Sequence, residues 1–120
     1  MSLVTTVLTV LVALEFLYIM YLETIVPTSN STSRVFAIPV EELKNQRVKT
    51  LFKNQGVYNG LIAVALLYGA FFSSNPSEIV GMLLVFIVLV ALYGGITSNP
   101  SIILKQGGLP LVTLATLLIL

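Results

Sequence analysis

Four long apolar stretches leave this sequence few ways to fold. They cover residues 3–22, 56–72, 79–96 and 102–120. A helix needs roughly 17–25 residues to cross the hydrocarbon core of a bilayer, and the four stretches fit this range. Barrel strands would be about half as long and would alternate polar with apolar side chains, whereas these runs are continuous. The sequence therefore predicts an all-α membrane protein, built as an antiparallel bundle of four transmembrane helices.

The composition supports the same class of protein. Hydrophobic residues make up 57% of the 120 residues, charged residues make up 9%, and the mean hydropathy is +1.01. A soluble domain carries about a quarter charged residues. We predict a single domain over residues 1–120, with a loop at residues 23–53. Its helices are expected at about residues 3–22, 54–73, 79–97 and 102–120.

The residue types that are missing exclude several kinds of chemistry. The chain has no cysteine and no histidine, which excludes disulfides, thiolate chemistry, histidine acid–base catalysis and nearly every transition-metal site. We therefore expect no metal and no cofactor. The net charge is only +1, and outside the loop described next no basic patch is interleaved with aromatics, so no nucleic-acid partner is predicted. The first apolar run lacks the basic start and small-residue cleavage site of a signal peptide.

The basic residues are unevenly distributed between the predicted loops. Lys105 lies between the third and fourth helices, and the other five lie between the first and second. These five are Arg34, Lys44, Arg47, Lys49 and Lys53. Both loops share one face of the membrane, which the positive-inside rule makes cytoplasmic. We predict a multi-pass protein of the inner (plasma) membrane with both termini outside, although so small a charge bias leaves dual topology open.

The long loop has a polar part and a basic amphipathic part. Residues 28–33, TSNSTS, are typical of a flexible connector. Residues 40–52 carry apolar side chains near helical spacing together with basic ones, and Pro39 with Glu41 and Glu42 suits a helix start. Such a segment either lies in the headgroup layer or extends the second helix into the cytoplasm. Attraction to anionic membrane lipids explains its charges.

A glutamate inside the first helix is the sharpest polar signal. Glu15 lies past the middle of the apolar run, where a charged residue costs roughly 2.5–3.5 kcal/mol on insertion scales. Such residues face the bundle and mark a pathway or a binding site; the alternative is a protonated carboxyl that holds helices together. Tyr18 lies one turn along the same side. Glu23 closes the helix at the cytoplasmic headgroups, where a carboxylate reaches water.

The second helix opens with the polar string NQGVYNG, residues 54–60. At about 100° per residue, Gln55, Tyr58 and Asn59 form one stripe. Amides and hydroxyls bond across helices in lipid for about 0.6–2 kcal/mol each, which leaves open an interhelical network or a ligand site. Gly56 and Gly60 are spaced for close helix packing.

The expected site lies where the first, second and fourth helices meet in the cytoplasmic half of the membrane. The fourth helix contributes Gln106, placed near Gln55 and Glu23. Counting the helical rise from each cytoplasmic end puts Glu15 at roughly 10 Å and Asn59 at roughly 7–8 Å, so the two should face each other. The predicted ligand-binding residues are Glu15, Tyr18, Glu23, Gln55, Tyr58, Asn59 and Gln106.

Over nearly its whole length the chain resembles the small bacterial membrane family catalogued as domain of unknown function 1304 (DUF1304). The resemblance rests on Glu15 with Tyr18 and Tyr21-Leu22-Glu23, on Val35-Phe36, on NQGVYNG, and on Gln106-Gly107-Gly108-Leu109-Pro110. It implies a four-helix integral membrane protein and no established activity. The family commonly has histidine after the first-helix glutamate, where this chain has Phe16, so a Glu–His relay or metal site is not expected.

Three functions follow from these features. The favoured one is binding or transport of a small molecule at the polar site by a transporter-type homodimer, paired through an aliphatic face of the third or fourth helix. In plan, the chain is similar to small multidrug-resistance exporters, whose carboxylate exchanges protons for a cationic substrate, but those exporters have short loops and lack NQGVYNG. The alternatives are a membrane enzyme that uses Glu15 on a lipid-phase substrate and a structural or partner-binding subunit. The lack of a second intramembrane carboxylate, of histidine and of a cofactor motif weighs against the enzyme, which stays open as an alternative.

Overall fold

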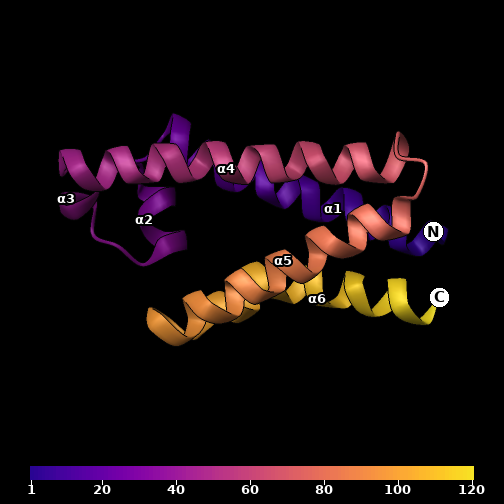
Figure 1. The fold of residues 1–120 in the computed structure, drawn as a ribbon. Coiled ribbons are helices and arrows are strands. Elements are labelled where there is room, and N and C mark those ends of the chain that lie inside the picture. Colours follow the sequence, from indigo (N-terminus) through magenta and orange to yellow (C-terminus); the bar gives the residue numbers. More distant parts are fainter. The chain divides into compact units, whose positions relative to one another are not determined.

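The computed structural model describes all 120 residues and is helical almost throughout (Figure 1). In chain order its elements are α1 (Leu3–Met20), a π-helical turn η1 (Tyr21–Ile25), α2 (Asn30–Phe36), α3 (Val40–Leu43), α4 (Gln46–Phe71), α5 (Pro76–Thr97) and α6 (Ser101–Ile119). The all-α class is therefore confirmed, with two short helices in the segment expected to be a loop. The chain divides into unit 1, Met1–Ala13 with Val64–Leu120, and unit 2, Leu14–Ala63.

Three helical segments are long and apolar enough to cross a membrane. They are Leu3–Ile25, Pro76–Thr97 and Ser101–Ile119. The 26 residues of α4 are long enough, but the polar string at residues 54–60 lowers their hydropathy. Apolarity alone therefore supports three crossings instead of the four that the sequence predicts.

In unit 1, α5 and α6 form a helical hairpin whose partners pack against each other (Figure 1). Asn75 caps α5, because its Oδ1 accepts a hydrogen bond from the Glu78 backbone N–H at 3.4 Å. A Cβ added at Gly107 would lie 3.0 Å from the Ala91 Cβ. The absence of a side chain at this position therefore sets the separation of the two helices.

A chain of hydroxyl groups joins the first turn of α1 to the last turns of α6 within unit 1. The Thr116 hydroxyl donates to the Thr113 carbonyl at 2.8 Å, so in its 2.9 Å contact with the Thr5 hydroxyl, Thr5 is the donor. Ser2 in turn donates to Thr5 at 2.9 Å. Each of these three hydroxyl protons has an acceptor. Because the Thr5–Thr116 contact joins the start of α1 to the end of α6, the N- and C-termini of the protein lie at the same end of unit 1 (Figure 1).

In unit 2, the segment predicted to be a flexible connector is folded, which corrects that prediction. The Ser29 hydroxyl accepts from the Thr32 backbone N–H at 3.1 Å and caps α2. The single proton of the buried Thr32 hydroxyl is shared between two acceptors, the Leu22 carbonyl at 2.9 Å and the Val26 carbonyl at 2.8 Å. Pro27 has no N–H to offer the Leu22 carbonyl five residues earlier. Thr32 supplies the missing donor and ties α2 to the end of η1.

The basic amphipathic segment is divided between two helices. Val40–Leu43 forms α3, and α4 begins at Gln46 and continues through the polar string without a break. The Asn45 Oδ1 accepts from the backbone N–H groups of Arg47 at 2.9 Å and Val48 at 3.3 Å, and so caps α4. Residues 46–53 are therefore a helical extension of the segment predicted as the second crossing.

Candidate functional site

The candidate site lies in unit 2, where η1 and the end of α1 pack against the first half of α4. Gly56 and Gly60 form the point of closest approach. A Cβ added at Gly56 would overlap the Thr24 hydroxyl, and one at Gly60 would overlap the Met20 sulfur. The close packing predicted for these glycines is therefore present, and it fixes which residues of α1 and η1 lie beside the polar string.

Two side chains make a buried polar contact across this interface. The Asn59 Nδ2 donates to the Glu23 Oε1 at 2.6 Å, and only 4% of the surface of Glu23 is exposed. Nearly two turns closer to the start of α4, the Thr24 hydroxyl donates to the Lys53 carbonyl at 3.0 Å. We therefore take Glu23 and Asn59, held in place by Thr24 and the two glycines, as the candidate site.

The carboxyl group is carried by the π-helical turn. Within η1 the Val26 N–H bonds to the Tyr21 carbonyl, five residues earlier, at 3.1 Å. Single π-turns are frequent at functional sites, because they insert one residue and reorient the side chains that follow. Glu23 lies at the centre of this turn. The next residue, Thr24, contacts α4 at Gly56 and at the Lys53 carbonyl.

The partner predicted for Asn59 was the wrong carboxylate. Met20 lies against Gly60 and Thr24 lies against Gly56, so Glu15, five residues before Met20, lies about 7.5 Å of helical rise from the level of Gly60, on the side away from Glu23. The depth count took Leu22 as the end of the first helix and treated it as level with Asn54. The helix instead continues through η1 to Ile25, and the contacts of Gly56 and Gly60 place Leu22 level with Tyr58, a register shift of four residues, or about one turn.

The structure places Glu15 in a different environment. Its Oε1 is buried and has no hydrogen-bond partner. Glu23, which was expected to reach water at the headgroups, is the buried and bonded carboxyl instead. Glu23 thus makes the contact with Asn59 that the sequence suggested for Glu15, while the Glu15 Oε1 is buried without a donor.

The remaining predicted residues lie outside the contact. Tyr18 and Tyr58 are 52% and 68% exposed, and Gln55 is exposed as well. Gln106 is half-buried in α6, within unit 1. The stripe on α4 was therefore placed on the wrong side: the glycines face α1, and Asn59 reaches the contact from its edge.

A heptad pattern in the sequence contained the signal for Glu23. Its members are spaced alternately four and three residues apart, the spacing of a buried helix face. They are Thr5, Thr9, Val12, Phe16, Ile19 and Glu23, and all six are buried. The pattern begins with two threonines and ends with Glu23, so a search for apolar residues alone finds only its middle, from Val12 to Ile19, and misses the glutamate.

Neither carboxyl group of α1 and η1 has a basic partner. The ion pair in the structure joins Lys44 and Glu41 at 3.9 Å, on and next to α3. The Asn59 amide is a neutral donor, and Glu15 Oε1 has no donor at all. Any compensating positive charge at these groups must therefore come from a proton or a bound cation.

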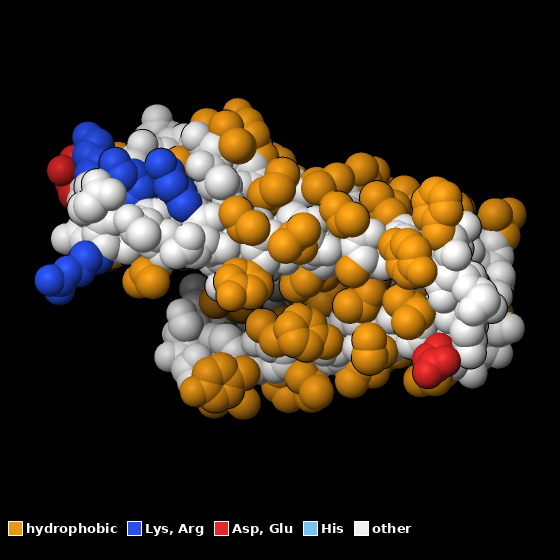
Figure 2. Space-filling view, turned by 45° about the horizontal axis from the view of Figure 1, so that its top comes forward, with side chains coloured by type: hydrophobic (Ala, Val, Ile, Leu, Met, Phe, Trp, Pro, Cys, Tyr) orange, Lys and Arg blue, Asp and Glu red, His pale blue; other side chains and the backbone are white.

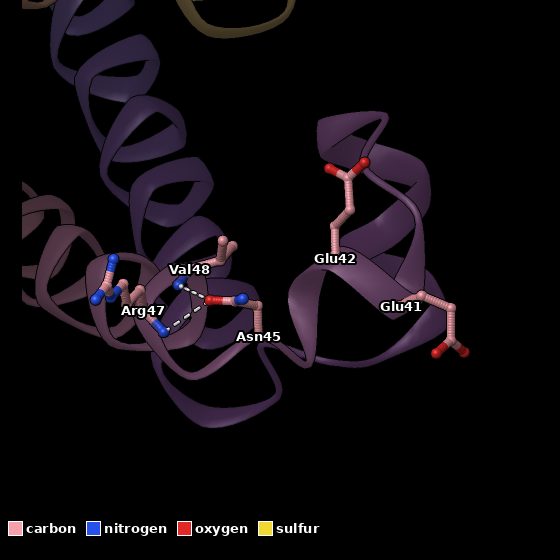
Figure 3. Close-up of a pocket in the computed structure, with 5 residues that line it drawn as sticks. All are labelled: Glu41, Glu42, Asn45, Arg47 and Val48. Carbon is pink, nitrogen blue, oxygen red and sulfur yellow. Dashed lines mark hydrogen bonds between the residues drawn. The ribbon is translucent and has the colours of Figure 1, made fainter.

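The open hollow between α3 and the start of α4 does not have the geometry of a binding site. It is lined by Glu41, Glu42, Asn45, Arg47 and Val48. Figure 3 shows the charged ends of the two glutamates and of Arg47 pointing in different directions, while Asn45 bonds to the α4 backbone. Its charges do not converge on a common point, and its polar contact is a helix cap.

Comparison with known proteins identifies relatives of this chain. The model of the family described as "Protein of unknown function (DUF1304)" matches residues 10–118. The chain is 59% identical over 114 residues to the "Uncharacterized protein YpaA" of Lactococcus lactis subsp. lactis (strain IL1403), an alignment that covers 95% of this chain and 96% of that protein. No solved structure matches.

Proposed function

Because the chain belongs to the DUF1304 family, whose function is unknown, we propose a function from the site itself: a transporter-type membrane protein that exchanges a proton for a small cation at Glu23. The observation that carries the proposal is a buried carboxyl in an apolar helical segment, bonded to the Asn59 amide and without a basic partner. Intramembrane carboxyls of this kind are costly and mark ion or substrate pathways.

The contact suits exchange because its partners are neutral. A carboxylate excluded from water needs a compensating positive charge or enough hydrogen-bond donors. Asn59 supplies one neutral donor, so the balance is completed by a proton or by a cationic ligand, and these compete for the same oxygen atoms. Glu15 offers a second carboxyl along α1, with an oxygen atom free to receive a donor.

Packing within unit 1 supports a fourth crossing by α4. The hydroxyl contact between Thr5 and Thr116 joins the start of α1 to the end of α6, which supports an arrangement with both termini on one side of the membrane. Three crossings would separate the termini, whereas four return them to the same side. Residues 54–71 of α4 span about 27 Å, close to the roughly 30 Å of a hydrocarbon core.

The topology that accompanies this proposal is testable because the chain has no native cysteine. We expect a cysteine at Ser77 to react with a membrane-impermeant maleimide in intact cells, and one at Ser31 to react only after the cells are opened. The reason is that the segment between the first crossing and residue 54 carries five basic residues and should be cytoplasmic. If the cysteine at position 31 is labelled in intact cells and the one at position 77 is not, the protein has the opposite orientation. Equal labelling of the two would indicate that the protein inserts in both orientations.

Proton release tests the function directly. We expect tetraphenylphosphonium added to the detergent-solubilised protein in weak buffer to acidify the medium in proportion to protein concentration. Glu23→Gln should abolish the release, because glutamine keeps the size and the acceptor for Asn59 but holds no exchangeable proton. Glu42→Gln, an exposed position on α3, is the matched control and should release protons like the unchanged chain.

A structural role for the same contact is the competing function, favoured by the short Asn59–Glu23 bond itself. A purely structural contact predicts no cation-dependent proton release from the unchanged chain at any pH between about 5 and 9. It also predicts that Glu23→Gln behaves like Glu42→Gln. Parallel measurements on Glu15→Gln show which of the two carboxyls exchanges the proton.

A further inference from the structure

Basic side chains surround the start of α4 and form what we call the basic collar. It consists of Lys44, Arg47, Lys49 and Lys53. Arg47 and Lys53 are exposed and Lys49 is partly exposed; of the four, Lys44 alone is in an ion pair, with Glu41 at 3.9 Å. Figure 2 shows Lys and Arg side chains gathered over this end of α4. The collar thus presents positive charge that the protein itself leaves almost uncompensated.

The collar is long enough to extend across a headgroup layer. Residues 46–53 precede the apolar part of α4 and rise about 12 Å. The interfacial region adds roughly 5–8 Å on each side of the hydrocarbon core. Arg47, Lys49 and Lys53 therefore lie within or just beyond the phosphate level when residues 54–71 cross the membrane, which is the part of the argument that rests on the proposed function.

An exposed apolar side chain within the collar favours a lipid over a soluble anion. Leu51 is 67% exposed and lies one turn after Arg47, on the same face of α4. The same exposed face continues to Tyr58 inside the crossing. A soluble phosphate would leave Leu51 in water, whereas a phospholipid supplies acyl chains beside Leu51 and a phosphate beside Arg47.

We propose that the basic collar binds the headgroups of anionic phospholipids on both sides of α4, since Lys49 and Lys53 lie on the opposite side of the helix from Arg47. Each basic side chain near an anionic surface contributes about 1 kcal/mol, or about a fivefold change in affinity. Three uncompensated cations on two helical turns therefore give a strong preference for anionic over zwitterionic lipid, and this preference weakens as salt screens the charges.

The preference for anionic over zwitterionic lipid can be measured from the lipids that the purified protein retains. The full-length protein is incubated with an equimolar mixture of dioleoylphosphatidylglycerol and dioleoylphosphatidylcholine in detergent, and the lipids that remain bound are counted by native mass spectrometry. We expect the unchanged chain to retain mostly phosphatidylglycerol. Arg47→Gln combined with Lys49→Gln and Lys53→Gln should weaken that preference by on the order of 100-fold. Lys105→Gln, an exposed cation on α6, should leave it unchanged.

Single variants of Arg47 and a competition with inorganic phosphate complete the test. If the triple variant does not fold, Arg47→Gln alone should weaken the preference about fivefold, while Arg47→Lys should retain most of it. Equal retention of the two lipids by the unchanged chain overturns the proposal, as does a triple variant with the original preference. Displacement of phosphatidylglycerol by millimolar inorganic phosphate also overturns it, because the collar would then be a site for free phosphate.

Discussion

Gly56→Ala should lower the free energy of unfolding in mixed micelles by about 1–3 kcal/mol, even though alanine is the better helix former by about 1 kcal/mol. The added Cβ would overlap the Thr24 hydroxyl and lie 3.1 Å from the Cβ atoms of Glu23 and Thr24. These atoms are close to the backbone of η1 and have little room to move. Relief therefore requires η1 to separate from α4, which also strains the Glu23–Asn59 bond.

Two other glycines serve as matched controls for this prediction. At Gly60 the overlapping atom is the sulfur of Met20, a flexible side chain that can rotate away, so Gly60→Ala should cost less than Gly56→Ala. At Gly108 the nearest atom lies 3.7 Å away, and alanine should be neutral or stabilising by up to about 1 kcal/mol. Equal effects at all three positions would show that the close contact at Gly56 is absent.

Asn59→Leu is expected to destabilise the protein by about 1–3 kcal/mol, because it leaves the Glu23 carboxyl buried without its donor. The effect should depend on Glu23. In a double-mutant cycle with Glu23→Leu, the coupling free energy should be about 0.6–2 kcal/mol, the range of hydrogen bonds between membrane helices. Unfolding measured for the four chains under one set of conditions gives this value.

Gln55→Leu is the control for the amide itself. Gln55 lies one turn from Asn59 but is exposed and outside the contact, so its loss should change stability by less than about 0.5 kcal/mol. A coupling near zero between positions 23 and 59, or a loss at position 55 as large as at position 59, would contradict the assigned contact. Retained stability with lost proton release in Glu23→Gln would separate function from packing at the same residue.

The polar string at the start of α4 thus combines two physical roles. Its glycines remove side chains where α1 and η1 approach most closely, and Asn59 supplies the donor for a carboxyl enclosed by that approach. Either role alone would leave the other incomplete, because a buried carboxyl without a donor is costly and a close contact without glycine is sterically blocked. The string lowers the hydropathy of α4 as a consequence of building this contact.

The sequence by itself determined the helical class and three of the four segments that it predicted to cross a membrane. Continuous apolar runs of crossing length have no other stable arrangement in lipid, where every backbone group must be bonded within its own segment. It also identified the polar string and the close packing at Gly56 and Gly60, since glycine spacing is a local property of one helix. The folded connector at Ser29 and Thr32 was missed, because its polar composition is equally typical of a flexible loop.

Only the tertiary structure decided which carboxylate contacts Asn59. The partner of Asn59 depends on how far α1 and α4 slide past each other, and a slide of one turn changes every pair at almost no cost to either helix alone. The contacts of Gly56 and Gly60 fix that slide, and the π-turn adds the residue that places Glu23 opposite Asn59. Helix register and a π-turn are products of packing between segments distant in the chain, so periodicity within one segment does not contain them.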